Sequence, residues 1–245
     1  MQRLRAHLGS GRAKTVKPVI DTFGTLRERF PKPSNVDPAV LARAQSLKST
    51  FLQRQPQPRP EVAPYWRRYQ QIFSPAGLAV TDPQALKDFA NSNIGANPGN
   101  MSVFNAAWHQ MGSETAAERV RETISYLLYG RDNVPLEDRL THLIEGHKGL
   151  GMTGFREALL TKVLCVMQPE RFIPIVKYTG MAGKKEVAKL VYDVDLYEPQ
   201  RVSWTIGRLI LWSNDLLLHL VGDGFQDMQH AVQFLWWAKD QPNQQ

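Results

Sequence analysis

Histidine, cysteine and closely spaced carboxylates are the residue types in this sequence that could hold a metal ion. None of the six histidines stands in an H-E-x-x-H pattern, which would place two imidazoles on one zinc ion. His142 and His147 lie five residues apart, a poor spacing for shared coordination, and Cys165 has no second cysteine beside it. Asp193 and Asp195 form the nearest carboxylate pair but lack a downstream partner of the nuclease type. We expect no metal site.

Two short loops resemble phosphate-binding loops in composition only. Residues 9–15 (GSGRAKT) and 180–185 (GMAGKK) combine glycine with lysine. Neither fits G-x-x-x-x-G-K-[ST], and neither follows a buried strand. Because the usual catalytic constellations are missing, we expect a protein that is not an enzyme and uses no cofactor.

A glycine turn, Gly149-Leu150-Gly151, is the strongest candidate for binding an anion. An apolar-Gly-x-Gly turn that opens onto a helix can present backbone N–H groups to a phosphate, helped by the helix dipole. Helix-hairpin-helix modules hold nucleic-acid backbones in this way without reading bases. Here helices over 136–144 and 154–167 would flank the turn, and Lys148, Arg156 and Lys162 would add charge. The alternative is that the glycines only allow close helix packing.

A second basic element follows at Lys177, Tyr178, Lys184 and Lys185. An aromatic ring among lysines can stack on a base or a ribose while the ammonium groups contact phosphates. The alternative is that Tyr178 packs in the core and the lysines are solvated.

The positive charge of the chain is concentrated near its N-terminus. The net charge is +7, and residues 1–60 hold twelve Lys/Arg against three Asp/Glu, whereas the remaining 185 residues sum to −2. Arg12, Lys14 and Lys17 are candidate phosphate contacts within this segment. Such an arm could bind nucleic acid in a salt-dependent way, or it could be a solvated tail.

Apolar periodicity and helix-end signals predict an all-α, bundle-like fold with a basic, partly disordered N-terminal arm. Ser113 and Gly130 are expected to cap the two ends of one helix, with Gly130 left-handed. Only 172–177 favours a strand, and a lone strand cannot build a sheet. We place a boundary at the proline-rich segment 55–60, giving an arm over 1–60 and a helical domain over 61–245. The expected helices are a short one from Asp37-Pro38, then 61–73, one from Pro83, 102–111, 113–129, 135–145, 154–167, 183–191, 199–220 and 227–239.

Composition is typical of a soluble protein with a substantial core, at 42% hydrophobic and 22% charged residues. No apolar run approaches the length that spans a bilayer, and the N-terminus lacks the apolar core of a secretory signal. A single cysteine fits a reducing compartment. We expect a cytoplasmic protein with no membrane partner.

The order of several short motifs resembles a helical region of bacterial restriction proteins. The motifs are residues 100–105 (NMSVFN), 124–130 (ISYLLYG), 149–151 (GLG), 161–164 (TKVL), 169–175 (PERFIPI), 178–180 (YTG) and 183–185 (GKK). In those proteins the region precedes an McrB-like AAA+ GTPase domain, and the resemblance spans roughly residues 61 to 239. It implies a DNA-recognition or assembly module of a defence system, with an AAA+ motor or a nuclease subunit as partner. The sequence does not include such a GTPase domain, so we expect a separate subunit, a cut-out domain or a relative with another role.

These observations predict a non-catalytic DNA-binding module that acts mainly through backbone phosphates. The rival prediction is a protein–protein scaffold subunit without nucleic-acid contact, in which some of the tryptophans Trp204, Trp212, Trp236 and Trp237 dock a partner.

Overall fold

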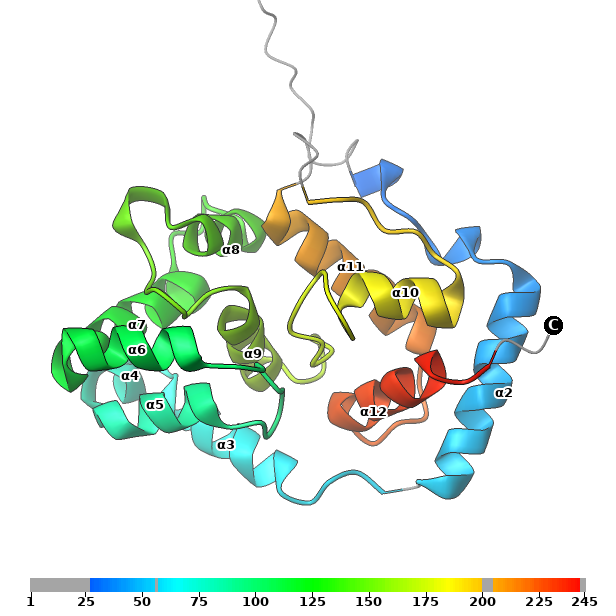
Figure 1. Cartoon of the computed structure of the whole chain (residues 1–245), viewed down its shortest axis with the longest axis horizontal. Helices are drawn as coiled ribbons and strands as arrows, with labels where there is room; N and C mark the ends of the chain where they lie inside the picture. Colours follow the sequence, from blue (N-terminus) through cyan, green and yellow to red (C-terminus); the bar gives the residue numbers. More distant parts are fainter. Residues whose placement is uncertain (1–26, 56, 200–204, 243–245) are drawn as a thin grey trace, which may run out of the picture.

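The computed structural model describes residues 27–55, 57–199 and 205–242, and within these ranges the protein is all-α (Figure 1). The described part contains no strand, only an isolated bridge between Met152 and Phe155. Its helices are α2 (Pro38–Arg54), α3 (Val62–Ile72), α4 (Pro75–Val80), α5 (Pro83–Asn91), α6 (Ser102–Met111), α7 (Ser113–Tyr129), α8 (Leu136–Glu145), α9 (Glu157–Met167), α10 (Lys184–Tyr192), α11 (Ile206–Val221) and α12 (Met228–Lys239), with two 3-10 turns, η1 (Pro33–Asn35) and η2 (His147–Gly149).

Local signals for helix starts act as predicted. At α5, Pro83 occupies the first position, where its missing N–H costs nothing, and Asp82 Oδ1 accepts from Gln84 N at 2.7 Å. Asp227 caps α12 in the same way, through His230 N at 2.7 Å. At α7 the expected N-cap Ser113 is wrong, because Gly112 occupies that position. Gly130 is the C-cap as predicted, with its N–H on Tyr126 O at 3.1 Å, but it is extended (φ −60°, ψ 167°) rather than left-handed. The six-residue α4 was not predicted.

The helices form two groups (Figure 1). One group contains α3 to α9, and the other contains α2, α10, α11 and α12. Helix α9 lies centrally, and every residue from Leu159 to Val166 is buried. The groups are joined by packing of α11 on α8. At this crossing Gly207 N donates to Thr141 Oγ1 at 3.0 Å, so the two backbones approach closely.

Helix α2 belongs to the folded body. It packs on α10 and α12, and Phe51 is 2% exposed, with the rings of His230, Phe234 and Trp237 centred 5.5–5.8 Å away. The expected boundary at residue 60 would separate α2 from the helices it packs against. The short apolar pattern after Pro38 is in fact a helix of 17 residues that packs on α10 and α12.

Candidate nucleic-acid interface

The glycine turn between α8 and α9 is at the surface where predicted. Gly146 ends α8 in the left-handed conformation (φ 71°), and Gly149 and Gly151 also have positive φ angles of 73° and 82°. Gly149 is exposed, and a Cβ there would meet no atom within 4 Å. The amide of Leu150, however, donates to His147 O at 2.9 Å. The central N–H of the predicted phosphate cradle therefore already has a partner.

The turn does not open directly onto the next helix. Helix α9 begins at Glu157 rather than at Gly154, because Gly154 (φ 79°) packs against the Phe104 backbone and the chain first makes the Met152–Phe155 bridge. The first turn of α9 also holds a carboxylate: Glu157 Oε1 accepts from Tyr178 N at 2.5 Å. The helix dipole is thus complemented by a side chain of the same protein, which removes the expected anion site at this N-terminus.

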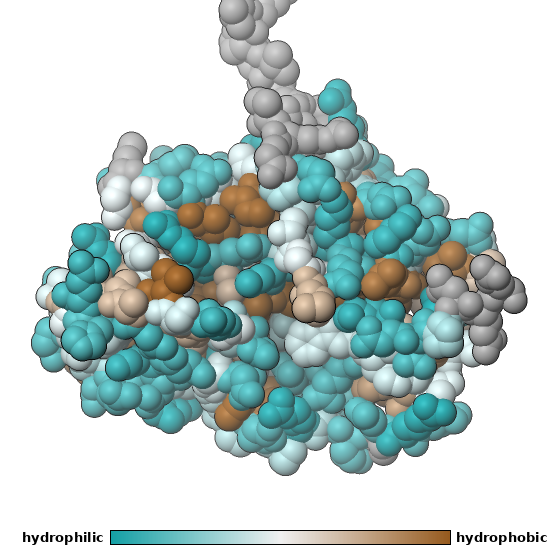
Figure 2. Space-filling model, viewed as in Figure 1, coloured by the Kyte–Doolittle hydropathy of each residue, from teal (hydrophilic) through white to brown (hydrophobic). Residues whose placement is uncertain are grey.

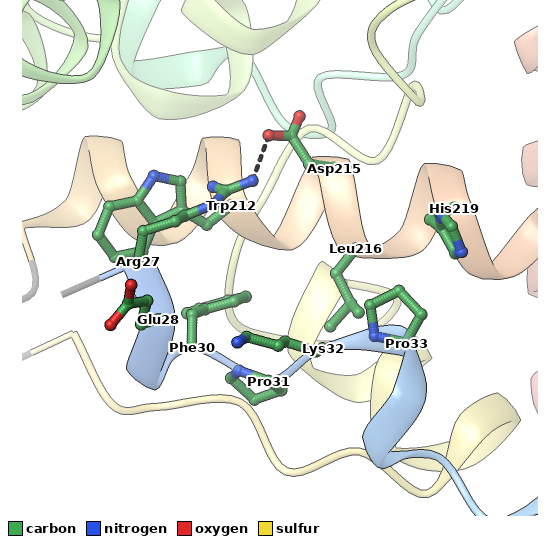
Figure 3. A pocket seen from close by; sticks show the side chains of 10 residues that line it. All are labelled: Arg27, Glu28, Phe30, Pro31, Lys32, Pro33, Trp212, Asp215, Leu216 and His219. Atoms are coloured by element: carbon green, nitrogen blue, oxygen red, sulfur yellow. Dashed lines mark hydrogen bonds and ion pairs between the residues drawn. The ribbon is translucent and has the colours of Figure 1, made fainter. Parts of the chain in front are cut away.

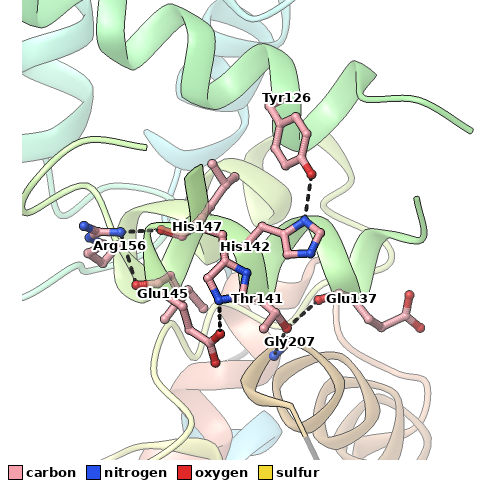
Figure 4. Close-up of polar contacts among 10 residues, drawn as sticks. Tyr126, Glu137, Thr141, His142, Glu145, His147, Arg156 and Gly207 are labelled. Atoms are coloured by element: carbon pink, nitrogen blue, oxygen red, sulfur yellow. Dashed lines mark hydrogen bonds and ion pairs between the residues drawn. The ribbon is translucent and has the colours of Figure 1, made fainter. Parts of the chain in front are cut away.

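Arg156 serves the fold rather than a ligand. Its Nη1 donates to the carbonyls of Leu143 (2.6 Å) and Ile144 (3.2 Å), at the end of α8 (Figure 4). These carbonyls lack helical partners, and a guanidinium satisfies both their hydrogen bonds and the negative end of the dipole. The hypothesis that Arg156 adds charge beside a bound phosphate is corrected accordingly. The side chain of Lys148 lies outside the described part of the structure.

Tyr178 and Lys184 are buried, so neither can contact a polyanion on this surface. Tyr178 is 0% exposed, and its hydroxyl donates to Tyr197 O at 2.5 Å. Lys184 is equally inaccessible and donates to Ile175 O, and burial lowers the pKa of Lys184 to about 8. Both predictions of nucleic-acid contact are wrong, because the apolar environment that makes Tyr178 a core residue also encloses the lysine.

The other two members of this cluster differ from each other. Lys185 forms an ion pair with Glu198 and so is partly neutralised. Lys177 is exposed. Lys162, expected beside the glycine turn, is also buried in the core and contacts the end of α5 instead. Gly149 and Lys177 are exposed and therefore remain as accessible candidates, while Gly151 is half-buried.

Six cations of the body donate to backbone carbonyls and form no ion pair with a described carboxylate. Four helices, α4, α5, α8 and α11, have a C-terminal carbonyl bound in this way, and Lys48 provides one example by donating to Val221 O at 2.8 Å. The six are Arg43, Lys48, Arg121, Arg156, Lys162 and Lys184. Their charge counts toward the net charge of the chain, but Lys48, Arg121, Arg156 and Lys162 direct it at helix ends. Arg43 and Lys184 direct it at carbonyls outside helices.

Part of the expected arm is also bound to the body. Arg27 Nη2 and Asp215 Oδ2 are 2.6 Å apart, and the Arg27 guanidinium lies over the ring of Trp212 (Figure 3). The ion pair lies at a pocket of about 270 Å³ that is also lined by Lys32 and Glu28. The candidate contacts Arg12, Lys14 and Lys17 lie outside the described residues.

Two histidines near the turn make local polar contacts (Figure 4). His142 Nδ1 lies 2.8 Å from the hydroxyl of Tyr126, and His147 Nε2 lies 2.8 Å from Glu145 Oε2. Within the described ranges, no group of three or more His, Cys, Asp or Glu side chains has an arrangement that could hold a metal ion.

The four tryptophans of the scaffold hypothesis differ in how exposed they are to a partner. Trp212 is buried, Trp236 and Trp237 are half-buried, and Trp204 lies outside the described residues. Among large hydrophobic side chains, Met181 (91%) and Val103 (60%) are far more exposed. On the face shown in Figure 2, hydrophobic residues appear as separate areas within a mainly hydrophilic surface.

Sequence reasoning missed one basic surface, on α2. Arg43 and Arg54 line a single groove with Trp237 of α12. The spacing of residues 43, 47, 50 and 54 indicates that they share one face of a helix, because they are three or four residues apart. The predicted boundary at residue 60 places these residues in the arm, whereas α2 belongs to the folded body.

No helix of the described residues is both long and apolar enough to cross a membrane. Comparisons of the chain with protein-family models, with curated proteins and with solved structures find no match.

Proposed function

We propose that this protein is a non-catalytic DNA-binding module that holds backbone phosphates without reading sequence. The observation that carries the proposal is the distribution of charge. Residues 1–26 hold five Lys/Arg against one Asp, a net +4 of the total +7, in about a tenth of the chain. A cluster of this kind releases counterions when it neutralises phosphates, which favours binding to any nucleic acid.

The charge of the folded body favours binding through residues 1–26. Residues 27–245 contain 25 Lys/Arg against 22 Asp/Glu, and five of those cations have no surface role because they are directed at backbone carbonyls, namely Lys48, Arg121, Arg156, Lys162 and Lys184. The outer surface of the body is therefore close to neutral or slightly acidic. The affinity for a polyanion must then come mainly from Arg3, Arg5, Arg12, Lys14 and Lys17, with Lys177 and the Gly149 turn as secondary contacts.

A place in a bacterial restriction or anti-phage system is part of the proposal. It is supported by the order of the motifs between residues 100 and 185 and by no catalytic residue. In this role the protein would hold DNA while an AAA+ motor or a nuclease subunit acts on it.

Salt-dependent binding by the full-length protein tests the proposal. Affinity for a labelled duplex and for a single strand of equal length would be measured from about 50 to about 200 mM salt. A variant with Arg3, Arg5, Arg12, Lys14 and Lys17 replaced by glutamine should bind more weakly. The slope of log affinity against log salt should become shallower by up to about 0.9 per lost duplex contact.

The control replaces Arg67 and Arg68, exposed on α3, by glutamine, which should leave the slope nearly unchanged. Absence of binding by the wild-type protein, or a slope that the five substitutions leave intact, contradicts the proposal. That result would favour the scaffold, with Val103 and Met181 as the first side chains to test for partner contact.

A further inference from the structure

A groove of about 430 Å³ runs between one face of α2 and the end of α12. Arg43 and Arg54 lie toward its two ends, Ser46 and Thr50 lie between them, and Trp237 forms the opposite wall. The Arg54 guanidinium is 6.0 Å from the centre of the Trp237 ring. Arginine, hydroxyl and aromatic side chains together are suited to a ligand that has both phosphates and flat rings.

The groove carries two uncompensated cations, whereas the pockets at Lys177 and at Lys48 have one cation each and no acidic residue. The lining of the groove has two arginines and no acidic residue. The pocket at Arg27 and Lys32 also contains Glu28 and Asp215, and the pocket at Lys185 and Lys189 also contains Glu186 and Asp195. An anion entering the α2–α12 groove meets uncompensated positive charge, whereas in the pockets at Arg27 and at Lys185 it meets carboxylates.

The two arginines are held differently. Arg43 Nη2 donates to Gln241 O (3.2 Å) and Pro242 O (3.5 Å), which fixes the guanidinium at one end while its other N–H groups have no acceptor among the described residues. Arg54 is exposed and pairs with no described carboxylate. Thr50 donates its hydroxyl proton to Ser46 O at 3.0 Å and keeps its lone pairs as acceptors.

The length of the groove suits a polymer with several phosphates along its chain. Eleven residues of α-helix separate Arg43 from Arg54, an axial distance of about 16 Å. Successive phosphates of one strand can lie at the two ends of a groove of this length. Trp237 is half-buried, with the Phe51 ring centre 5.8 Å away and the Arg54 guanidinium over its ring at 6.0 Å. A base reaches this ring by displacing the exposed Arg54 guanidinium, which then turns to a phosphate. A base can stack there only if it is unpaired.

We propose that the α2–α12 groove binds single-stranded nucleic acid, with phosphates at Arg43 and Arg54 and one unpaired base on Trp237. This inference rests on the proposed function, since it names the form of nucleic acid and the surface that receives it.

Three variants of the full-length protein test the groove with a labelled oligo-dT and a duplex as probes. Arg54→Gln should weaken single-strand binding about fivefold and make the salt slope shallower by about 0.7. Trp237→Leu should weaken single-strand binding by about fivefold or more, as expected for loss of one stacked base, and change duplex affinity less. Arg67→Gln, an exposed arginine on α3, is the matched control and should bind like the wild type. Circular dichroism checks that each variant is folded.

The outcomes separate this inference from the proposed function. If the wild type binds nucleic acid and Arg54→Gln binds as well as the wild type, the groove is wrong while the proposed function stands. If Trp237→Leu folds and weakens duplex and single-strand binding equally, base stacking is overturned. If the wild type binds neither probe, the proposed function has failed and the groove proposal fails with it.

Discussion

The ammonium group of Lys162, on α9, donates to the carbonyl of Phe89 at the end of α5, 2.9 Å away. It also donates to Ser92 O and lies over the rings of Phe89 and Tyr65, at 4.7 and 5.3 Å from their centres. A lysine in the middle of the apolar helix α9 thus donates hydrogen bonds to carbonyls at the C-terminal end of the neighbouring helix α5. The same arrangement, in which a cation binds the last carbonyls of a helix that does not contain it, recurs at α4, α8 and α11.

Replacing Lys162 by methionine should destabilise the fold by about 2–3 kcal/mol. The substitution keeps the apolar stem but removes the ammonium donor from the carbonyls of Phe89 and Ser92, and Phe89 O keeps only the 3.5 Å bond from the Tyr65 hydroxyl. Chemical denaturation of the variant measures the loss. Lys32→Met, at an exposed position, should change the free energy of unfolding by less than about 0.5 kcal/mol. Equal stability of the two variants would contradict the role of Lys162.

Stability should rise with pH above neutrality because of this lysine. Burial lowers the pKa of Lys162 to about 7 in the folded protein, against 10.5 for an ordinary lysine. Between these values the unfolded chain binds a proton that the folded chain has lost, so the free energy of unfolding increases with pH. The neutral amine still donates to Phe89 O. Denaturation of wild type and Lys162→Met at pH 7, 8 and 9 checks this: the increase should be smaller in the variant, and identical slopes would refute it.

Gly207→Ala should destabilise the protein by about 1–3 kcal/mol, although alanine is the better helix former. A Cβ at Gly207 would lie 1.9 Å from Glu137 O, so the packing of α11 on α8 must open. Thermal unfolding measures the effect. Ser125→Ala, at an exposed position of α7, is the control and should be close to neutral. A more stable Gly207→Ala variant would show that the helices are not in close contact there.

Phe51→Ala should cost about 3–5 kcal/mol, the usual range for removing a buried phenyl group. The ring lies between α2 and α12, so its loss tests whether α2 belongs to the body. If α2 were part of a detached arm, the unfolding transition of the body would not change. Gln53→Ala on the exposed face of α2 provides the comparison.

Lysine labelling should distinguish the three predicted contacts Lys177, Lys184 and Lys185. A water-soluble amine reagent should modify exposed Lys177 readily and buried Lys184 at least about tenfold more slowly, since Lys184 reacts only after local opening. Lys185, in its ion pair with Glu198, should lie between them. Mass spectrometry of partly labelled protein gives the order, and rapid modification of Lys184 would contradict its burial.

The sequence determined the local structure well, because the interactions that start and stop helices are local. Asp82-Pro83, Asp227 and Gly146 fix helix ends through bonds and φ angles within a few residues, and apolar periodicity gave the faces of α7, α8 and α12. The glycine turn at Gly149 was found for the same reason. What periodicity could not show is how far α2 extends past its apolar start, or that α9 begins only at Glu157, since both depend on contacts with distant segments.

Only the tertiary structure decided where the charged side chains go. In sequence, Arg156, Lys162 and Lys184 look like solvent-exposed cations near a turn, and nothing local distinguishes them from Lys177. Their partners are carbonyls of Leu143 and Phe89, near the ends of α8 and α5, and of Ile175, in the non-helical segment between α9 and α10. A backbone carbonyl carries no sequence signature, so a cation that binds one cannot be told from a free cation until the helices are assembled.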